Sequence, residues 1–270
     1  MDKYSIGFRM QFDDVKPEDI VEWVTDYLDI FDRYEIKVTN NIISSGKIYE
    51  LLEVSRKLAD GRYSLHIPKD ALVTTQSYNE TQKLVEILRN YKNTKRVYLI
   101  THIPYGDFQK YLAKILNILV NLPTNYTLLL ENEKVERDNK EYMLQINKLC
   151  AWLCKYEIAN VGVCLDIGHL LFGAYREGIT QEYCLEQLAR MSYILPMIMQ
   201  VHIHDYLCID HLQLGKGLIN LENVSEFIIE KGLKIPIIIE TTVEHPKYDG
   251  KNQVVLMDKA LKKVKETIEW

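Results

Sequence analysis

The stretch Gly162-Val-Cys-Leu-Asp166 decides the fold, because it is an apolar run of strand length that ends on a carboxylate. Five other runs share this form: each stays apolar up to its last residues, delivers a His or Glu, and is followed by a helix-like segment. They are Tyr63–His66, 97–102, 127–131, 199–202 and 237–240. Ligands that end six such strands would converge on one point. The pattern therefore predicts a metal site at the carboxyl-end mouth of a βα barrel.

Strand-length apolar runs alternate with segments of helical period eight times along the chain. We expect strands at 4–10, 33–39, 63–67, 96–103, 126–130, 160–165, 196–203 and 235–240. We expect helices from about 17 to 31 and at 46–59, 79–91, 108–122, 140–156, 181–195, 221–231 and 253–269. This order predicts an α/β protein, a single (β/α)8 TIM barrel with one domain over residues 1–270. An open doubly wound sheet would need a Gly-rich phosphate turn after the first strand, and residues 9–12 offer none.

Length, net charge and cysteine content limit the binding partners and the cellular location that we expect for this protein. A length of 270 residues suits one barrel, which typically has about 250. The net charge of -5 argues against a duplex nucleic-acid partner, although a local basic patch would be compatible with it. The first residues show no signal peptide, and no apolar run is long enough to span a membrane. Five cysteines without a disulfide-like spacing favour free thiols, so we expect a cytoplasmic protein.

Four of the strand ends form the candidate metal site. Glu131, Asp166, His202 and Glu240 end the fifth to eighth expected strands. Any one of them alone would be read as a capped strand end or a surface charge. Carboxylates combined with one imidazole are ligands that suit Mn²⁺, Co²⁺, Mg²⁺ or Zn²⁺. The four together therefore predict a divalent-metal cofactor.

Several short motifs resemble one known superfamily. They are Leu128-Leu-Leu-Glu-Asn132, Leu165-Asp-Ile-Gly-His169, Val201-His-Ile-His-Asp205, His211-Leu-Gln-Leu-Gly-Lys-Gly217 and Ile238-Ile-Glu-Thr241. Their order and spacing resemble the xylose isomerase-like TIM-barrel superfamily, which includes sugar isomerases and epimerases and the endonuclease IV group. The resemblance implies that Glu131, Asp166, His202 and Glu240 bind one catalytic divalent metal.

The isomerase and epimerase branch gives the first functional expectation. The resemblance implies that Glu131 and Glu240 lie on opposite sides of the substrate carbon and move its proton, while the metal stabilises an enediolate. His169 would hydrogen-bond a sugar hydroxyl, and His66, His102 and His211 would also contact substrate. We therefore expect an isomerase or epimerase of a small sugar or a related keto or hydroxy compound. Many epimerases carry an Arg shortly after the seventh strand, however, and residues 205–217 contain none.

The endonuclease IV branch gives the alternative expectation, a multi-metal phosphoester hydrolase. The resemblance implies that His66 and His102 join Glu131 around a second metal there, and that His169 and His211 help to hold a third. That pattern has an Asp where this chain has Ile209, and Asp210 or Asp205 could substitute. The acidic charge favours a small-molecule phosphodiester such as a cobamide over abasic DNA. A non-catalytic metal-binding barrel is a further alternative.

The segment after the seventh strand contains three features with two interpretations each. His204 faces the opposite side of a regular strand from His202, which favours a hydrogen-bonding core role over ligation. Asp205 could orient a ligand histidine or cap the following loop. Gly215-Lys-Gly217 could cradle a phosphate with backbone amides, but such a sequence is more often a turn.

Overall fold

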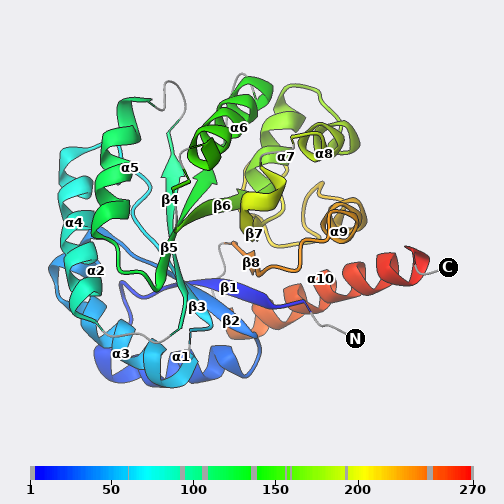
Figure 1. Cartoon of the computed structure of the whole chain (residues 1–270). Coiled ribbons are helices and arrows are strands. Elements are labelled where there is room, and N and C mark those ends of the chain that lie inside the picture. Colours follow the sequence, from blue (N-terminus) through cyan, green and yellow to red (C-terminus); the bar gives the residue numbers. More distant parts are fainter. Residues whose placement is uncertain are drawn as a thin grey trace. The chain divides into compact units, whose positions relative to one another are not determined.

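The computed structural model describes residues 4–59, 61–91, 95–104, 109–134, 139–155, 157–158, 160–191, 194–241 and 246–268. Within these ranges the strands are β1 (Ile6–Gln11), β2 (Arg33–Lys37), β3 (Tyr63–His66), β4 (Val97–Ile103), β5 (Tyr126–Asn132), β6 (Val161–Asp166), β7 (Ile198–Ile203) and β8 (Ile237–Ile239). Their order in the sheet follows the sequence from β1 to β8, and the sheet closes (Figure 1). The fold is the (β/α)8 TIM barrel that the alternation of strands and helices predicts.

Helices separate the strands along the chain. They are α1 (Ile20–Leu28), α2 (Asn40–Ser44), α3 (Lys47–Ala59), α4 (Thr75–Asn90), α5 (Gln109–Asn121), α6 (Asn139–Lys155), α7 (Ile167–Arg176), α8 (Gln181–Ala189), α9 (Leu221–Glu230) and α10 (Pro246–Ile268). Two short 3₁₀ helices, Pro17–Asp19 and Leu195–Met197, precede α1 and β7. Among the helices of the described ranges, none combines the length and the hydropathy that a bilayer span requires.

The chain divides into two compact units. Unit 1 comprises Met1–Gly7, Asn132–Glu157 and Val163–Trp270, and unit 2 comprises Phe8–Glu131 and Ile158–Gly162. In unit 1, β6, β7 and β8 pair in parallel, α8 packs beside α7, and α10 packs beside α9 (Figure 1). In unit 2, β2, β3 and β4 pair in parallel, and α3 packs beside α1. One domain over residues 1–270 stays a prediction.

The strands are buried on both faces, which explains their sequences. Every residue of β3, β5 and β6 is buried. Parallel strands covered on both faces carry continuous apolar runs rather than alternating ones, and the Ile237–Ile239 strand shows this directly. A polar side chain inside such a run is expensive to bury unless it is paired. The polar residues of these strands therefore mark positions where the barrel needs hydrogen bonds or ligands.

Several helix boundaries differ from the sequence-based expectation. The expected helices leave residues 167–176 as loop, yet α7 begins directly after β6 because Asp166 ends the strand and also caps the helix. Helix α4 begins at Thr75, since the Thr74 side chain accepts a hydrogen bond from Ser77 N and caps it there. The helix expected at 181–195 ends at Ala189, and α10 begins at Pro246 rather than at 253.

Candidate metal centre

In unit 2, three strands deliver a histidine–carboxylate cluster. His66 ends β3, and His102 and Glu131 are the penultimate residues of β4 and β5. One nitrogen or oxygen atom from each lies within 4.8 Å of the others, and all three side chains are buried. Glu131 Oε2 lies 2.7 Å from His66 Nε2 and 3.5 Å from His102 Nε2. Donor atoms from three strands therefore lie close enough together to be candidate ligands of one cation.

The backbone sets the tautomer of His66. Its Nδ1 lies 3.0 Å from the Ile67 carbonyl oxygen, and a carbonyl can only accept, so Nδ1 carries the proton. In the neutral ring, Nε2 then presents a lone pair to Glu131 Oε2. Two lone pairs 2.7 Å apart repel unless a proton or a metal cation lies between them. Burial lowers the pKa of His66 despite the neighbouring Glu131, which favours the neutral form of the ring.

In unit 1, the ends of three consecutive strands form a second cluster. Asp166 ends β6, His202 lies on β7, and Glu240 directly follows β8. Their ligand atoms lie within 4.8 Å of one another, and His202 Nδ1 is 2.8 Å from Glu240 Oε2. Glu240 N donates to the Ile203 carbonyl, which holds the residue in line with the strands. All three side chains are buried, and buried carboxylates need a cation or a histidine to balance their charge.

Asp166 is held in place by its neighbours on both sides. The Asn132 amide donates to the Asp166 carbonyl and accepts from Asp166 N, each at 2.8 Å. Asp166 Oδ1 accepts from His169 N at 2.7 Å and thereby caps α7. Burial opposes ionisation of this carboxyl, but His169 and His204 outweigh it and hold the pKa of Asp166 well below its usual range. The side chain is therefore a carboxylate, which is the form that binds metals.

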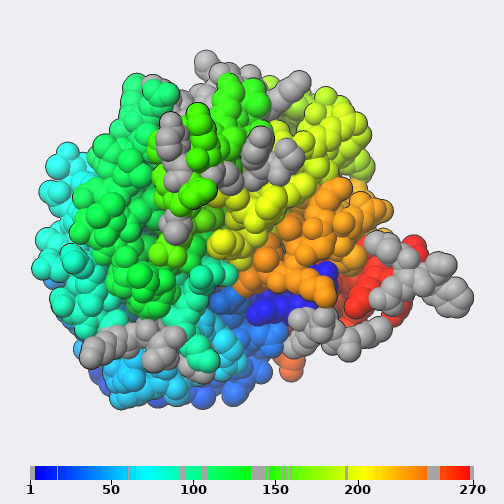
Figure 2. All heavy atoms as spheres, viewed as in Figure 1, coloured from blue at the N-terminus to red at the C-terminus, as the bar shows by residue number. Residues whose placement is uncertain are grey.

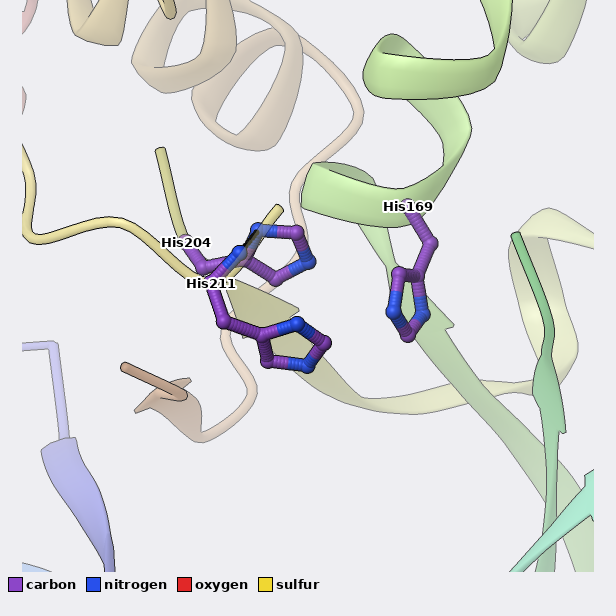
Figure 3. A group of neighbouring side chains, drawn as sticks. All are labelled: His169, His204 and His211. Carbon is purple, nitrogen blue, oxygen red and sulfur yellow. Dashed lines mark hydrogen bonds between the residues drawn. The ribbon is translucent and has the colours of Figure 1, made fainter. Parts of the chain in front are cut away.

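Three further histidines gather in unit 1, one from α7 and two from the segment after β7 (Figure 3). The rings of His204 and His211 stack, with centroids 4.3 Å apart and an angle of 10° between their planes. The His169 ring stands edge-on to both, at centroid distances of 4.9 and 5.0 Å. Burial lowers the pKa of His211 to about 4, so this ring is neutral at pH 7 and able to bind a metal.

Hydrogen bonding separates His204 from the other two. Its Nδ1 accepts from His211 N at 3.0 Å, so in the neutral ring the proton is on Nε2, which faces Asp166 Oδ1 at 3.5 Å. The competing contact from Nδ1 to the Asp205 carbonyl is longer, at 3.2 Å, and that oxygen already accepts from Leu212 N. A protonated Nε2 cannot ligate. In this tautomer His204 accepts from the backbone of His211, and the core hydrogen-bonding role that the sequence favours stays a prediction.

Asp210 supplies a carboxylate beside the other two histidines. Its Oδ1 lies 3.4 Å from His211 Nδ1, and its Oδ2 lies 3.9 Å from His169 Nε2. His211 and, more weakly, Lys134 lower the pKa of Asp210, against the opposing effect of burial. The Lys134 ammonium is 3.1 Å from Asp210 Oδ2. The Asp210 carboxylate therefore lies beside His169 and His211, one residue after Ile209, and is paired with the Lys134 ammonium.

Asp205 organises the loop that carries His211. Its carboxylate is fully buried and accepts four backbone N–H groups: Oδ1 those of Tyr206 and Ile219, and Oδ2 those of Gly215 and Gly217, all at 2.8–2.9 Å. Residues 205–219 form part of the yellow-to-orange surface of unit 1 in Figure 2. Asp205 thus caps the loop. The interpretation of Gly215-Lys-Gly217 as a phosphate cradle is wrong, because both glycine amides point to this carboxylate.

Three buried polar residues near these clusters were not expected from the sequence. Gln200 lies on β7, and its amide nitrogen is 2.9 Å from His202 Nε2. Glu35 lies on β2, accepts a hydrogen bond from Ser64 Oγ at 3.0 Å and has an oxygen within 4.8 Å of a ring nitrogen of His66. Asn132 follows Glu131 on β5. Each is a polar residue inside an otherwise apolar strand, which is the signal that could have identified them.

Comparison with known proteins places the chain in a family. A family model described as "Xylose isomerase-like TIM barrel" matches residues 69–270, which is well over half of the chain. The chain belongs to the xylose isomerase-like TIM-barrel family. No curated protein matches its sequence.

Solved structures with this fold include enzymes of both branches. An endonuclease IV from Thermus thermophilus shares 15% identity at a TM-score of 0.68, over 96% of this chain and 99% of that one. L-ribulose 3-epimerase shares 14% identity at a TM-score of 0.63, over 98% and 97%. A xylose isomerase-like TIM barrel protein from Mycobacterium smegmatis, in complex with magnesium, shares 13% identity at a TM-score of 0.62, over 98% and 100%. At these identities the likeness shows the fold alone.

Proposed function

We propose that this member of the xylose isomerase-like family is a multi-metal phosphoester hydrolase. The observation that carries the proposal is the contact of His66 Nε2 and His102 Nε2 with one oxygen of Glu131. An isomerase that binds one metal through four strand-end residues does not need this arrangement. The second support is the group of His169, His211 and Asp210, whose donor atoms suit another cation.

The proposed metal ligands fall into three sets. The first is His66, His102 and Glu131; the second is Asp166, His202 and Glu240; the third is His169, His211 and Asp210. The resemblance implies that Glu131 also serves the second set. Bound divalent cations would stabilise the negative charge of the transition state and make a water more acidic.

The substrate class follows from charge. The net charge of -5 is unfavourable for binding duplex DNA, whose affinity depends on neutralising many phosphates. A small phosphodiester presents one negative charge, which the cations themselves would neutralise. We therefore assign a small-molecule phosphodiester as the substrate class, with damaged DNA as the alternative to be tested beside it.

The metal content of the purified protein tests the proposal. After loading with Zn²⁺ and removal of the excess, elemental analysis should find two or three metals per chain. His66→Ala should lose about one of them and the hydrolysis of bis(p-nitrophenyl) phosphate. Asp258→Asn, which removes one partner of an exposed ion pair with Lys262, should keep both. One metal per chain, unchanged in His66→Ala, would contradict the proposal.

A sugar isomerase or epimerase is the second candidate. It is supported by Glu131 and Glu240, two buried carboxylates that could move a proton from and to a substrate carbon. In that case the loaded protein should hold one metal and exchange a carbon-bound hydrogen of a ketose with D₂O. Glu240→Gln should abolish this exchange while leaving the fold intact.

A further inference from the structure

Strand β1 in unit 2 carries a cationic side chain on the inner face of the sheet. The ring of Phe8 packs against those of Tyr27 and Phe31, at centroid distances of 6.2 and 5.3 Å, so Phe8 points toward helix α1. Successive side chains of a strand point to opposite faces. The guanidinium side chain of Arg9 therefore lies on the inner face, three residues from the carboxyl end of β1 counting the last one.

The neighbouring strand β2 ends in a second cation on the same face. Tyr34 points toward the helices, because its hydroxyl donates to Ser55 Oγ of α3 at 2.7 Å. Alternation then places Lys37, three residues further along, on the inner face. Lys37 is the last residue of β2 and is in register with His66, the last residue of β3. The inner faces of β1 and β2 thus present a guanidinium and an ammonium beside a proposed metal ligand.

The Lys37 ammonium has hydrogen-bond donors to spare. Among the contacts of the described residues, its Nζ donates only to Gln11 Oε1, at 3.4 Å. Lys47 in the same unit is different, because its Nζ donates at 2.8–3.0 Å to the carbonyl oxygens of Phe12, Asp13 and Val15. An ammonium has three donors. Lys47 therefore uses all of them to hold the loop after β1, whereas Lys37 is able to bind an anion.

The charges around Lys37 also favour an anion. Burial lowers the pKa of Lys37, Arg9 lowers it further, and Asp13 opposes them with a smaller effect. The two cations are thus near enough to repel each other. The Asp13 carboxylate is engaged elsewhere, since its Oδ1 accepts from Thr39 Oγ1 at 2.6 Å. An anion that contacts both cations would remove the repulsion. The chain as a whole is acidic, with a net charge of -5, so this pair does not belong to a generally basic protein.

We infer that Arg9 and Lys37 bind a phosphate group of the substrate other than the scissile phosphodiester. Metal cations at the proposed ligands would neutralise the single charge of a phosphodiester, so further cations beside His66 correspond to a further anionic group. A guanidinium can bind a phosphate through two parallel hydrogen bonds, and an ammonium adds a point charge. The inference rests on the proposed function only in that both phosphates belong to one molecule.

Binding of phenyl phosphate to the metal-free protein tests the inference without any catalysis. The titration is followed by phosphorus-31 NMR after removal of metals, in about 0.15 M NaCl to screen exposed charges. Lys37→Met and Arg9→Gln should each weaken binding by about 10-fold or more, because each removes a charged hydrogen-bond donor. Lys37→Arg keeps the charge and should bind within about 3-fold of the unchanged protein. Lys57→Met, which removes an exposed cation paired with Glu53, should bind within about 2-fold.

Three results would overturn the inference. They are undetectable binding to the unchanged protein, equal affinity in Lys37→Met and Lys57→Met, and binding of benzoate as tight as that of phenyl phosphate. The last result would assign a carboxylate in place of a phosphate. Circular dichroism of each variant shows whether it is folded, and Lys37→Arg provides the comparison if Lys37→Met is not. Failure of the proposed function is distinguishable, because it is measured by metal content and hydrolysis in the loaded protein.

Discussion

Replacing Asp205 by asparagine should destabilise the protein, because one carboxylate oxygen that accepts hydrogen bonds becomes an NH₂ group that can only donate them. The carboxylate is buried and accepts two backbone N–H groups at each oxygen. An asparagine that keeps Oδ1 toward Tyr206 and Ile219 places its NH₂ group toward Gly215 N and Gly217 N. Donors then face donors, so two hydrogen bonds are lost. The opposite orientation of the amide loses the other two.

The magnitude follows from these two bonds. A hydrogen bond to a charged group contributes about 1.5–3 kcal/mol. Gly215 is exposed, so water can accept a hydrogen bond from its N–H group and offset part of this loss. We expect the free energy of unfolding to fall by about 2–3 kcal/mol. For a chain of this size this lowers the melting temperature by roughly 4–6 °C.

Thermal unfolding followed by circular dichroism measures this effect. Asp258→Asn is the matched control, because the Asp258 carboxylate pairs only with exposed Lys262 among the contacts described, and such pairs contribute about 0–1 kcal/mol. A melting temperature for Asp205→Asn within about 1 °C of this control would refute the reasoning, and would mean that the loop amides find other acceptors.

Two further predictions concern the same loop. Gly217→Ala should lower stability by about 1–3 kcal/mol in urea unfolding, because its Cβ would overlap the Tyr206 carbonyl oxygen. Gly215→Ala has room and should cost only about 1 kcal/mol for its positive φ, so equal losses would contradict this account. His211, with its pKa lowered to about 4, should show an NMR titration midpoint near that pH rather than 6.5. Because its pKa is lower in the folded state, its stabilising contribution is complete above pH 6.5 and lost as the pH falls toward 4.

The strand ends could be predicted because burial leaves a clear pattern. A strand of a parallel barrel is apolar as far as it is covered, and the first ligand-type residue marks the mouth. Glu131, Asp166 and His202 accordingly lie at the last or penultimate position of their strands. Whether they bind a metal, and how many, stays a prediction.

The rest of the site depends on contacts that no local pattern encodes. Asp166 both ends β6 and caps α7, so no loop separates the strand from the helix. Without such a loop, the sequence gives no signal that a helix begins there. Asp205 and Asp210 are both possible ligands by sequence, and the conformation of the 205–219 loop gives their carboxylates different neighbours. Asp205 meets four amides there, whereas Asp210 meets two imidazoles.

Backbone contacts give two of the buried histidines opposite tautomers in the neutral ring. His66 and His204 are both buried and both lie among other histidines. A carbonyl holds Nδ1 of His66, which leaves Nε2 bare, whereas an N–H group holds Nδ1 of His204, which places the proton on Nε2. In the neutral rings, His66 Nε2 therefore carries a lone pair and His204 Nε2 carries the proton. The sequence does not distinguish these two histidines, because the fold alone determines which backbone group meets the second ring nitrogen.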